Sequence, residues 1–158
     1  MGHMAIMEIF ADGDPVLRQK AEPVTQITKK VRRLIKDMVE TMVAAEGVGL
    51  AAPQVGVSQR IIVVDVGEGP MAFINPEIQL SSGTQLDVEG CLSVPGVWGY
   101  VERAMEVVVT GLDENGKPTK IKADEFLARA LQHEIDHLDG VLFIDKILEI
   151  EPSEVEEE

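Results

Sequence analysis

The stretch His133-Glu134-Ile135-Asp136-His137 decides how the fold of this chain is interpreted. On a helix, two histidines four residues apart lie on one face, where both imidazoles can bind the same divalent metal ion. Glu134 is offset from His133 by about 100° on the helical wheel, so its carboxylate can lie beside the metal as a base without being a ligand. The pattern therefore predicts metal-assisted hydrolysis at a helix.

A third ligand is needed, because a catalytic metal of this kind usually takes three protein groups and leaves one position open. The only cysteine, Cys91, is the leading candidate. A lone cysteine is more often a small buried apolar residue. In Glu89-Gly90-Cys91-Leu92-Ser93, however, the glycine lets the backbone approach a ligand closely, and Leu92 brings an N–H next to the sulfur. These neighbours favour the ligand role.

Length and composition predict one domain with a buried core, since the chain has 158 residues of which 45% are apolar. One cysteine excludes an internal disulfide, and no apolar run reaches the roughly 18 residues of a membrane span. The net charge is −14, and six glutamates in residues 149–158 leave −8 for the rest. Both charges argue against direct nucleic-acid binding.

The chain divides into three parts on this interpretation. Residues 1–3, Met1-Gly2-His3, are typical of a cloning remnant, which leaves His133 and His137 as the only native histidines. Residues 4–148 form a single catalytic domain, and residues 149–158 form an acidic, mobile tail. The lack of a secretory signal predicts a cytoplasmic protein.

Hydrophobic periodicity predicts the elements around these motifs. Apolar residues at three- and four-residue spacing predict an amphipathic helix of about 18 residues from Thr28, ended by Gly47. Residues 47–54 read as an apolar loop, residues 60–66, 71–80 and 84–89 as strands, and Pro95-Gly96 as a turn.

The last third of the domain holds the metal-type motif. Residues 101–112 and 117–123 predict a hairpin, residues 124–138 a helix capped by Asp124, and residues 141–144 a short strand or packing segment. The predicted fold is α+β, with antiparallel strands around a central metal-binding HExxH helix and a second amphipathic helix packed outside.

Three segments together resemble the peptide deformylase family. They are Gly47-Val48-Gly49-Leu50-Ala51-Ala52-Pro53-Gln54, Glu89-Gly90-Cys91-Leu92-Ser93 and His133-Glu134-Ile135-Asp136-His137. HExxH occurs in many metallopeptidases, but the three segments in this order are highly specific. The resemblance extends from about Ile9 to Asp145.

The resemblance implies hydrolytic removal of the formyl group from the N-terminal formylmethionine of nascent proteins, with release of formate. It assigns Cys91, His133 and His137 as metal ligands. Water made nucleophilic by the metal attacks the formyl carbonyl, with Glu134 as the general acid and base.

The same resemblance assigns the contacts to the substrate. Gln54 and the Leu92 N–H stabilise the oxyanion, and the backbone of Gly49 pairs with the peptide. Arg103 matches a family arginine near the substrate backbone.

Other residues carry open alternatives. An apolar slot for methionine is predicted from Val48, Phe126, Ala130 and Leu92, although ordinary core packing is an alternative for Phe126 and Ala130. Gln54 could instead cap its own turn. Glu89 and Asp136 could orient ligands or form surface salt bridges. Trp98 and Tyr100 are left without an assignment.

The resemblance also implies one metal ion per chain, Fe²⁺ in the cell, with Zn²⁺, Ni²⁺ or Co²⁺ in purified protein; a thiolate ligand can support each of them. The expected partners are N-formylmethionyl peptides and nascent chains, with no membrane. Many bacterial members continue into a further helix where this chain turns acidic, which puts ribosome docking through such a helix in doubt.

Two alternatives remain at this point. One is an HExxH metalloendopeptidase, which cysteine as third ligand disfavours. The other is a non-catalytic module that binds formyl-peptides, which would have no need of Glu134 and Gln54.

Overall fold

The computed structural model describes residues 6–149, which form an α+β fold with antiparallel sheets and two α-helices, as predicted. The helices are α1 (Lys29–Ala44) and α2 (Glu125–Leu138), and the strands are β1 (Gly49–Ala51), β2 (Ile61–Val64), β3 (Met71–Ser82), β4 (Gln85–Cys91), β5 (Val94–Arg103), β6 (Glu106–Leu112) and β7 (Pro118–Asp124). Three short 3₁₀ helices are η1 (Pro15–Arg18), η2 (Ala52–Val55) and η3 (Phe143–Asp145).

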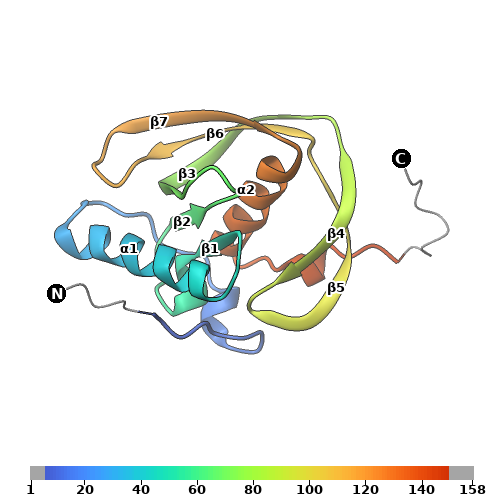
Figure 1. Cartoon of the computed structure of the whole chain (residues 1–158), viewed down its shortest axis with the longest axis horizontal. Helices are drawn as coiled ribbons and strands as arrows, with labels where there is room; N and C mark the ends of the chain where they lie inside the picture. The colour runs from blue at the N-terminus through green and yellow to red at the C-terminus, as the bar shows by residue number, and fades with distance from the viewer. Residues whose placement is uncertain (1–5, 150–158) are drawn as a thin grey trace.

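The strands form two separate sheets. The larger has the order β1-β2-β3-β6-β7, and the smaller is the β4–β5 hairpin. Every neighbouring pair is antiparallel. Figure 1 shows α2 near the middle of the molecule, with α1 to its left and β4–β5 to its right. The last turns of α2 thereby come close to the end of β4.

The larger sheet is buried on both faces at β2. Ile62 and Val64 pack in a cluster with residues of α2, whereas Ile61 and Val63 pack in a second cluster with residues of α1. Successive side chains of a strand point to opposite faces, so a strand of four apolar residues fits between two helices. This sandwich holds α2 firmly in place behind the site.

The predicted α1 helix is confirmed, but its end differs from the prediction. Thr28 is the N-cap, and its hydroxyl accepts a hydrogen bond from the Val31 N–H at 3.3 Å. The left-handed residue that ends the helix is Glu46, with φ of +59°, and not Gly47. The Gly47 N–H bonds the Met42 carbonyl, which is the pattern of a Schellman motif with its left-handed position one residue earlier than predicted.

One turn prediction and one strand prediction were wrong. Pro95-Gly96 lies inside β5, and the chain reverses at residues 92–93, between the paired residues Cys91 and Val94. Residues 101–112 are not one strand, because β5 ends at Arg103 and β6 begins at Glu106 in the other sheet. A local pattern of apolar residues predicts an extended chain. It does not predict where the chain stops pairing with one strand and passes into another sheet.

Smaller differences concern short segments. Gly49–Ala51, expected within a loop, forms β1 and pairs with β2. Residues 141–144 contain a 3₁₀ turn and no strand, although Leu142 and Phe143 are fully packed, as the alternative prediction had it. The predicted cloning remnant and all but the first residue of the predicted acidic tail lie outside the described residues. Within residues 6–149, no helix has the length and apolar character needed to span a bilayer.

Candidate metal centre and active site

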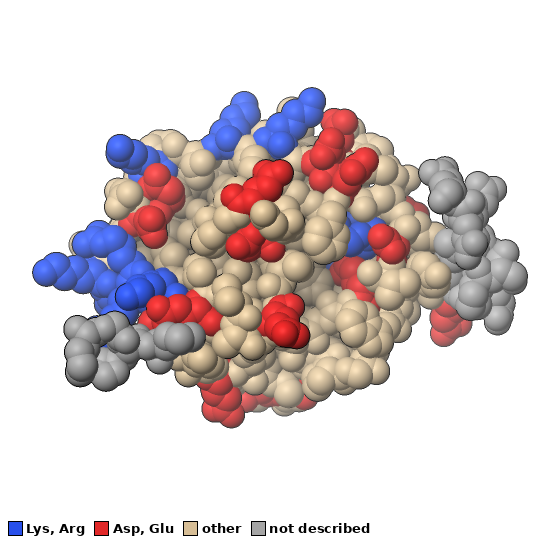
Figure 2. Space-filling view, in the orientation of Figure 1, with Lys and Arg blue, Asp and Glu red and all other residues tan. Residues whose placement is uncertain are grey.

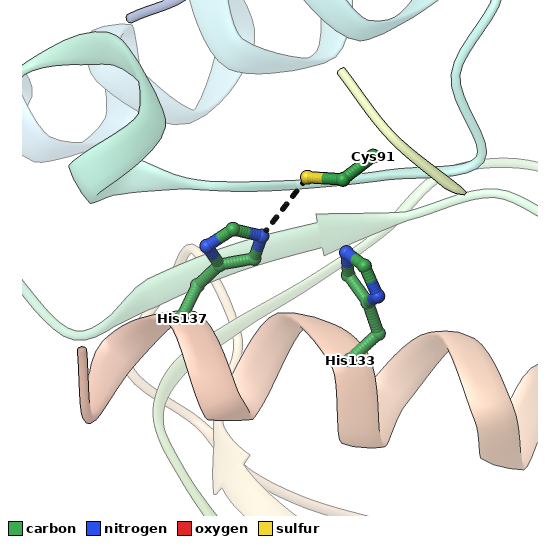
Figure 3. Close-up of side chains that lie close together, drawn as sticks. All are labelled: Cys91, His133 and His137. Carbon is green, nitrogen blue, oxygen red and sulfur yellow. Dashed lines mark hydrogen bonds between the residues drawn. The ribbon is translucent and has the colours of Figure 1, made fainter. Parts of the chain in front are cut away.

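Cys91, His133 and His137 come together as the motifs predict. Cys91 is the last residue of β4, and both histidines lie in the second half of α2. One possible ligand atom from each residue lies within 4.8 Å of the others. Figure 3 shows both imidazoles rising from α2 towards the cysteine, with the Cys91 Sγ 3.3 Å from the His137 Nε2.

The donor set fits one divalent metal ion. The His133 Nδ1 contacts the Glu89 Oε1 at 2.9 Å, which leaves its Nε2 as the ligand atom. Burial lowers the pKa of His137 well below its usual value and keeps this imidazole neutral, the form that binds metals. Burial also lowers the pKa of His133, but contacts with Cys91 and Glu89 raise it to about 10, so the surroundings favour a positive charge. One sulfur and two imidazoles suit a divalent transition-metal ion.

Glu89 contacts the His133 ring at the Nδ1 atom, on the side away from the expected metal. It is 6% exposed and also accepts hydrogen bonds from the Arg103 Nε at 2.8 Å and from Arg129. Burial alone would raise the pKa of Glu89, but the hydrogen bonds from Arg103 and His133 outweigh burial and hold that pKa well below its usual range. The carboxylate therefore stays ionised and fixes the orientation of the His133 imidazole.

Arg103 lies behind this carboxylate and does not line the cavity. It is 4% exposed, and besides Glu89 it contacts the Asp136 Oδ2 at 2.5 Å. Burial lowers the pKa of Arg103, but the two carboxylates raise it overall, so the guanidinium remains charged. The observed contacts of Arg103 are thus with Glu89 and Asp136, and its expected place near the substrate backbone stays a prediction.

Glu134 lies at the cavity, next to the metal-type residues. It is 4% exposed, and its Oε1 has no hydrogen-bond partner within the described part of the chain. Burial raises the pKa of Glu134 to about 7, which suits a group that accepts and returns a proton near neutral pH. A Cβ on Gly49 would come within 2.9 Å of the Glu134 Cδ, so a glycine at this position makes room for the carboxylate.

Gln54 caps its own turn, as one of the two interpretations of the sequence has it, and its other end lies beside the cysteine. Its Oε1 accepts from the Ala51 N–H at 2.9 Å, which caps its own turn. Its Nε2 donates to the Ser93 Oγ at 3.1 Å and contacts the Cys91 Sγ at 3.5 Å. The amide is thus fixed with its NH₂ group beside the thiol.

A cavity of about 490 Å³ opens next to these residues. It falls in the size range of small-molecule and peptide pockets. The predicted apolar slot residues all line it: Val48, Leu92, Phe126 and Ala130. Phe126 is 52% exposed and lies at the rim, so the core-packing alternative for this residue was wrong. Trp98 also lines the cavity and is 71% exposed.

Sequence reasoning missed Arg129 and Ser93. Arg129 precedes His133 by four residues, so it lies on the same helix face as the two histidines. That spacing was the available signal for its contact with Glu89. Ser93 gave no comparable signal, because its contact with Gln54 depends on how the turn after β4 and η2 meet in space.

Comparison with known proteins identifies the relatives of this chain. Residues 6–153 match the family model described as polypeptide deformylase. Peptide deformylase of Halothermothrix orenii is 62% identical over 93% of this chain and 97% of its own length. The solved Thermotoga maritima peptide deformylase has a TM-score of 0.89 at 46% identity, covering 90% of this chain and 98% of its own.

A further solved structure, Ehrlichia chaffeensis peptide deformylase in complex with actinonin, has a TM-score of 0.90 at 42% identity, covering 92% of this chain and 91% of its own. The family resemblance seen in the three motifs is thus confirmed over nearly the whole chain. These matches favour deformylation over the endopeptidase and binding-module alternatives. The chain belongs to the polypeptide deformylase family, whose members are hydrolases that act on N-formyl peptides.

Proposed function

We propose that this chain removes the formyl group from N-terminal formylmethionine by the roles assigned below. The observation that carries the proposal is the placement of Glu134. Its buried carboxylate, with one unpartnered oxygen, adjoins the Cys91, His133 and His137 group at the cavity. A structural metal site would have no need of such a base.

Cys91, His133 and His137 would hold the metal, with α2 acting as the central metal-binding helix of the fold. A thiolate and two imidazoles suit a divalent ion once His133 has released its ring proton on metal binding, and we propose Fe²⁺ in the cell with Zn²⁺, Ni²⁺ or Co²⁺ as substitutes. When bound, the metal supplies Lewis-acid polarisation of the carbonyl and lowers the pKa of water.

Glu134 would serve as general base and then as general acid. With a pKa of about 7, the carboxylate can accept a proton from the attacking water and return it to the leaving amine. Its free Oε1 is the atom available for this transfer. Gly49 keeps the carboxylate in place by leaving no side chain between the two elements.

The formyl oxygen would be stabilised by Gln54 and the Leu92 N–H as negative charge develops. Gln54 is 1% exposed and held by Ala51 and Ser93, so its NH₂ group is positioned before the substrate arrives. Donors fixed in this way contribute on the order of 10²- to 10³-fold in rate each.

The substrate would lie across the cavity mouth as an extended chain. The Gly49 backbone pairs with the peptide, and the methionine side chain enters the slot formed by Val48, Leu92 and Ala130, with Phe126 at its rim. Arg103 would act indirectly, by holding Glu89 and thus His133.

The proposed substrates are formylmethionyl peptides and nascent chains, which arise where proteins are made. On this basis we place the reaction in the cytoplasm. Residues 4–148 would form the catalytic domain.

Formate release from a formyl-Met peptide by anaerobically Fe²⁺-loaded protein tests the proposal. We expect Glu134→Ala to lose at least 10²-fold in kcat with its metal retained, because general acid–base catalysis contributes that much. Glu102→Ala, an exposed glutamate of β5, is the matched control and should keep full activity. Inactivity of the unaltered chain, or equal activity of Glu134→Ala, would refute the assignment.

A further inference from the structure

Positive charge is concentrated at the start of α1, in residues that we call the α1 basic cluster: Lys29, Lys30, Arg32, Arg33 and Lys36. All five side chains are exposed, and none forms an ion pair with another residue in the described range 6–149. Figure 2 shows blue side chains gathered on the left, over the helix that Figure 1 labels α1.

The net charge of the cluster is opposite in sign to that of the chain as a whole. It holds five of the 14 basic residues within eight positions, and residues 29–36 contain no acid. Because the whole chain carries −14, the remainder carries −19. The net charge of the whole chain argued against nucleic-acid binding. That net charge does not describe the potential close to a local basic surface such as this cluster.

The placement of these charges works against the helix. Cations near a helix N-terminus oppose the helix dipole, and the first turn of α1 contains no acidic residue to offset them. Lys29 with Arg33, and Arg32 with Lys36, are like-charge pairs four residues apart, which are also unfavourable. A sequence feature that conflicts with local stability indicates a function on that surface.

The shape of the cluster favours a phosphate backbone as its partner. At 100° per residue, the five side chains fall within an arc of about 160°, and they extend about 10 Å along the axis. The opposite face, with Val31, Ile35 and Met38, is buried in the core. Without exposed apolar residues the cluster has no anchor for a bilayer and no apolar centre for a protein interface, whereas phosphate contacts need neither.

We propose that the α1 basic cluster docks this enzyme on RNA through the phosphate backbone. The choice of RNA rests on the proposed function, since a nascent chain is held close to RNA while it is made. The cluster occupies the first two turns of α1, whereas Glu46, Gly47 and Val48 of the cavity follow its last turn. Docking at this end therefore leaves the cavity free for the peptide.

The test compares two triple variants of the Zn²⁺-loaded full chain. Lys29→Gln, Lys30→Gln and Lys36→Gln neutralise the cluster, and Lys20→Gln, Lys120→Gln and Lys122→Gln remove the same charge from exposed lysines elsewhere. Binding to a fluorescent RNA hairpin is measured by anisotropy over a range of salt concentrations. The cluster triple should weaken binding more than tenfold and reduce the slope of log K against log salt by about 2 to 3, because each phosphate contact contributes about 0.7 to 0.9.

The control triple should change RNA affinity less than threefold. Both triples should release formate from a short formyl-Met peptide at the unaltered rate, which separates this proposal from the proposed function. Equal losses in both triples, no RNA binding by the unaltered chain, or tighter binding to duplex DNA, to polyglutamate or to phosphatidylserine vesicles than to RNA would overturn the proposal.

Discussion

Gly49 and Glu134 show how a single missing methyl group makes room for the carboxylate that we propose as the base. Gly49→Ala would place a Cβ 2.9 Å from the Glu134 Cδ, so the carboxylate must move. Because a displacement of about 1 Å can cost on the order of 10²-fold in rate, we expect kcat/KM for a formyl-Met peptide to fall about 10- to 100-fold. Gly49 is not among the metal-type residues, so the metal content per chain should stay unchanged.

Formate release and metal analysis on the same Gly49→Ala sample check this prediction. Full activity would show that Glu134 tolerates the shift or is not the base. Loss of metal together with activity would show that the substitution disturbs the whole site.

At the residue scale, the motifs predicted the metal-type group because sequence spacing fixes position on a helix. His133 and His137 must share a face of α2, and both meet Cys91. Sequence spacing could not show that Glu89 would contact two arginines and an imidazole at once, since these contacts join β4, β5 and α2. Long-range contacts of this kind depend on topology, which residue patterns do not encode.

At the scale of elements, Glu89 joins β4 to α2. Glu89→Gln would leave Arg103 and Arg129 partly uncompensated in a buried position. Breaking a buried ion pair by removing one partner costs about 3 kcal/mol or more of unfolding free energy, and loss of a ligand-orienting partner typically costs 10- to 100-fold in metal affinity. Urea unfolding and Zn²⁺ competition with a chelator measure both effects.

Glu102→Gln provides the comparison for Glu89→Gln, because Glu102 is an exposed glutamate of the neighbouring strand. It should change neither stability nor Zn²⁺ affinity. An unaltered Zn²⁺ affinity in Glu89→Gln would contradict the role of this carboxylate in orienting His133.

Elements were predicted well where one local signal decides them. The 3.6-residue period located α1 and α2, and Asp113 to Gly116 located the β6–β7 hairpin. Gly96 misled the turn prediction because it does have a positive φ, of +79°, yet the chain continues along β5. Whether a left-handed residue reverses a chain depends on the pairing around it, here the register of β4 with β5.

At the scale of the molecule, an ion pair joins the two ends of the domain. Arg18 of η1 contacts the Asp145 Oδ2 of η3 at 2.5 Å and thereby holds the pKa of Asp145 below its usual value. A carboxylate with a lowered pKa stabilises the fold above its unfolded pKa, near 3.9, and loses this effect as the pH falls through the folded value. When the pH is lowered from 7 to 3, the free energy of unfolding should therefore decrease less in Asp145→Asn than in the unaltered chain.

Urea unfolding at both pH values measures this difference. The two side chains are about 40% exposed, so the difference should stay below about 1 kcal/mol. Asp124→Asn, at an exposed aspartate whose side chain makes no capping hydrogen bond, should keep the pH dependence of the unaltered chain. The same dependence in all three proteins would show that the pair contributes nothing.

Overall charge illustrates the limit of whole-chain quantities. A net charge of −14 is correct as a sum, yet it concealed the α1 basic cluster because charge acts over distances of about 10 Å and not over a whole molecule. Composition bounded the domain and its core, but the location of each charge required the fold.

The central claim is that Cys91, His133 and His137 bind one metal ion together. X-ray absorption at the zinc edge of the Zn²⁺-loaded chain tests it directly. The account predicts one sulfur at about 2.3 Å and two imidazole nitrogens at about 2.0 to 2.1 Å, with the sulfur lost in Cys91→Ser. A spectrum without sulfur in the unaltered chain, or one that Cys91→Ser leaves unchanged, would contradict it.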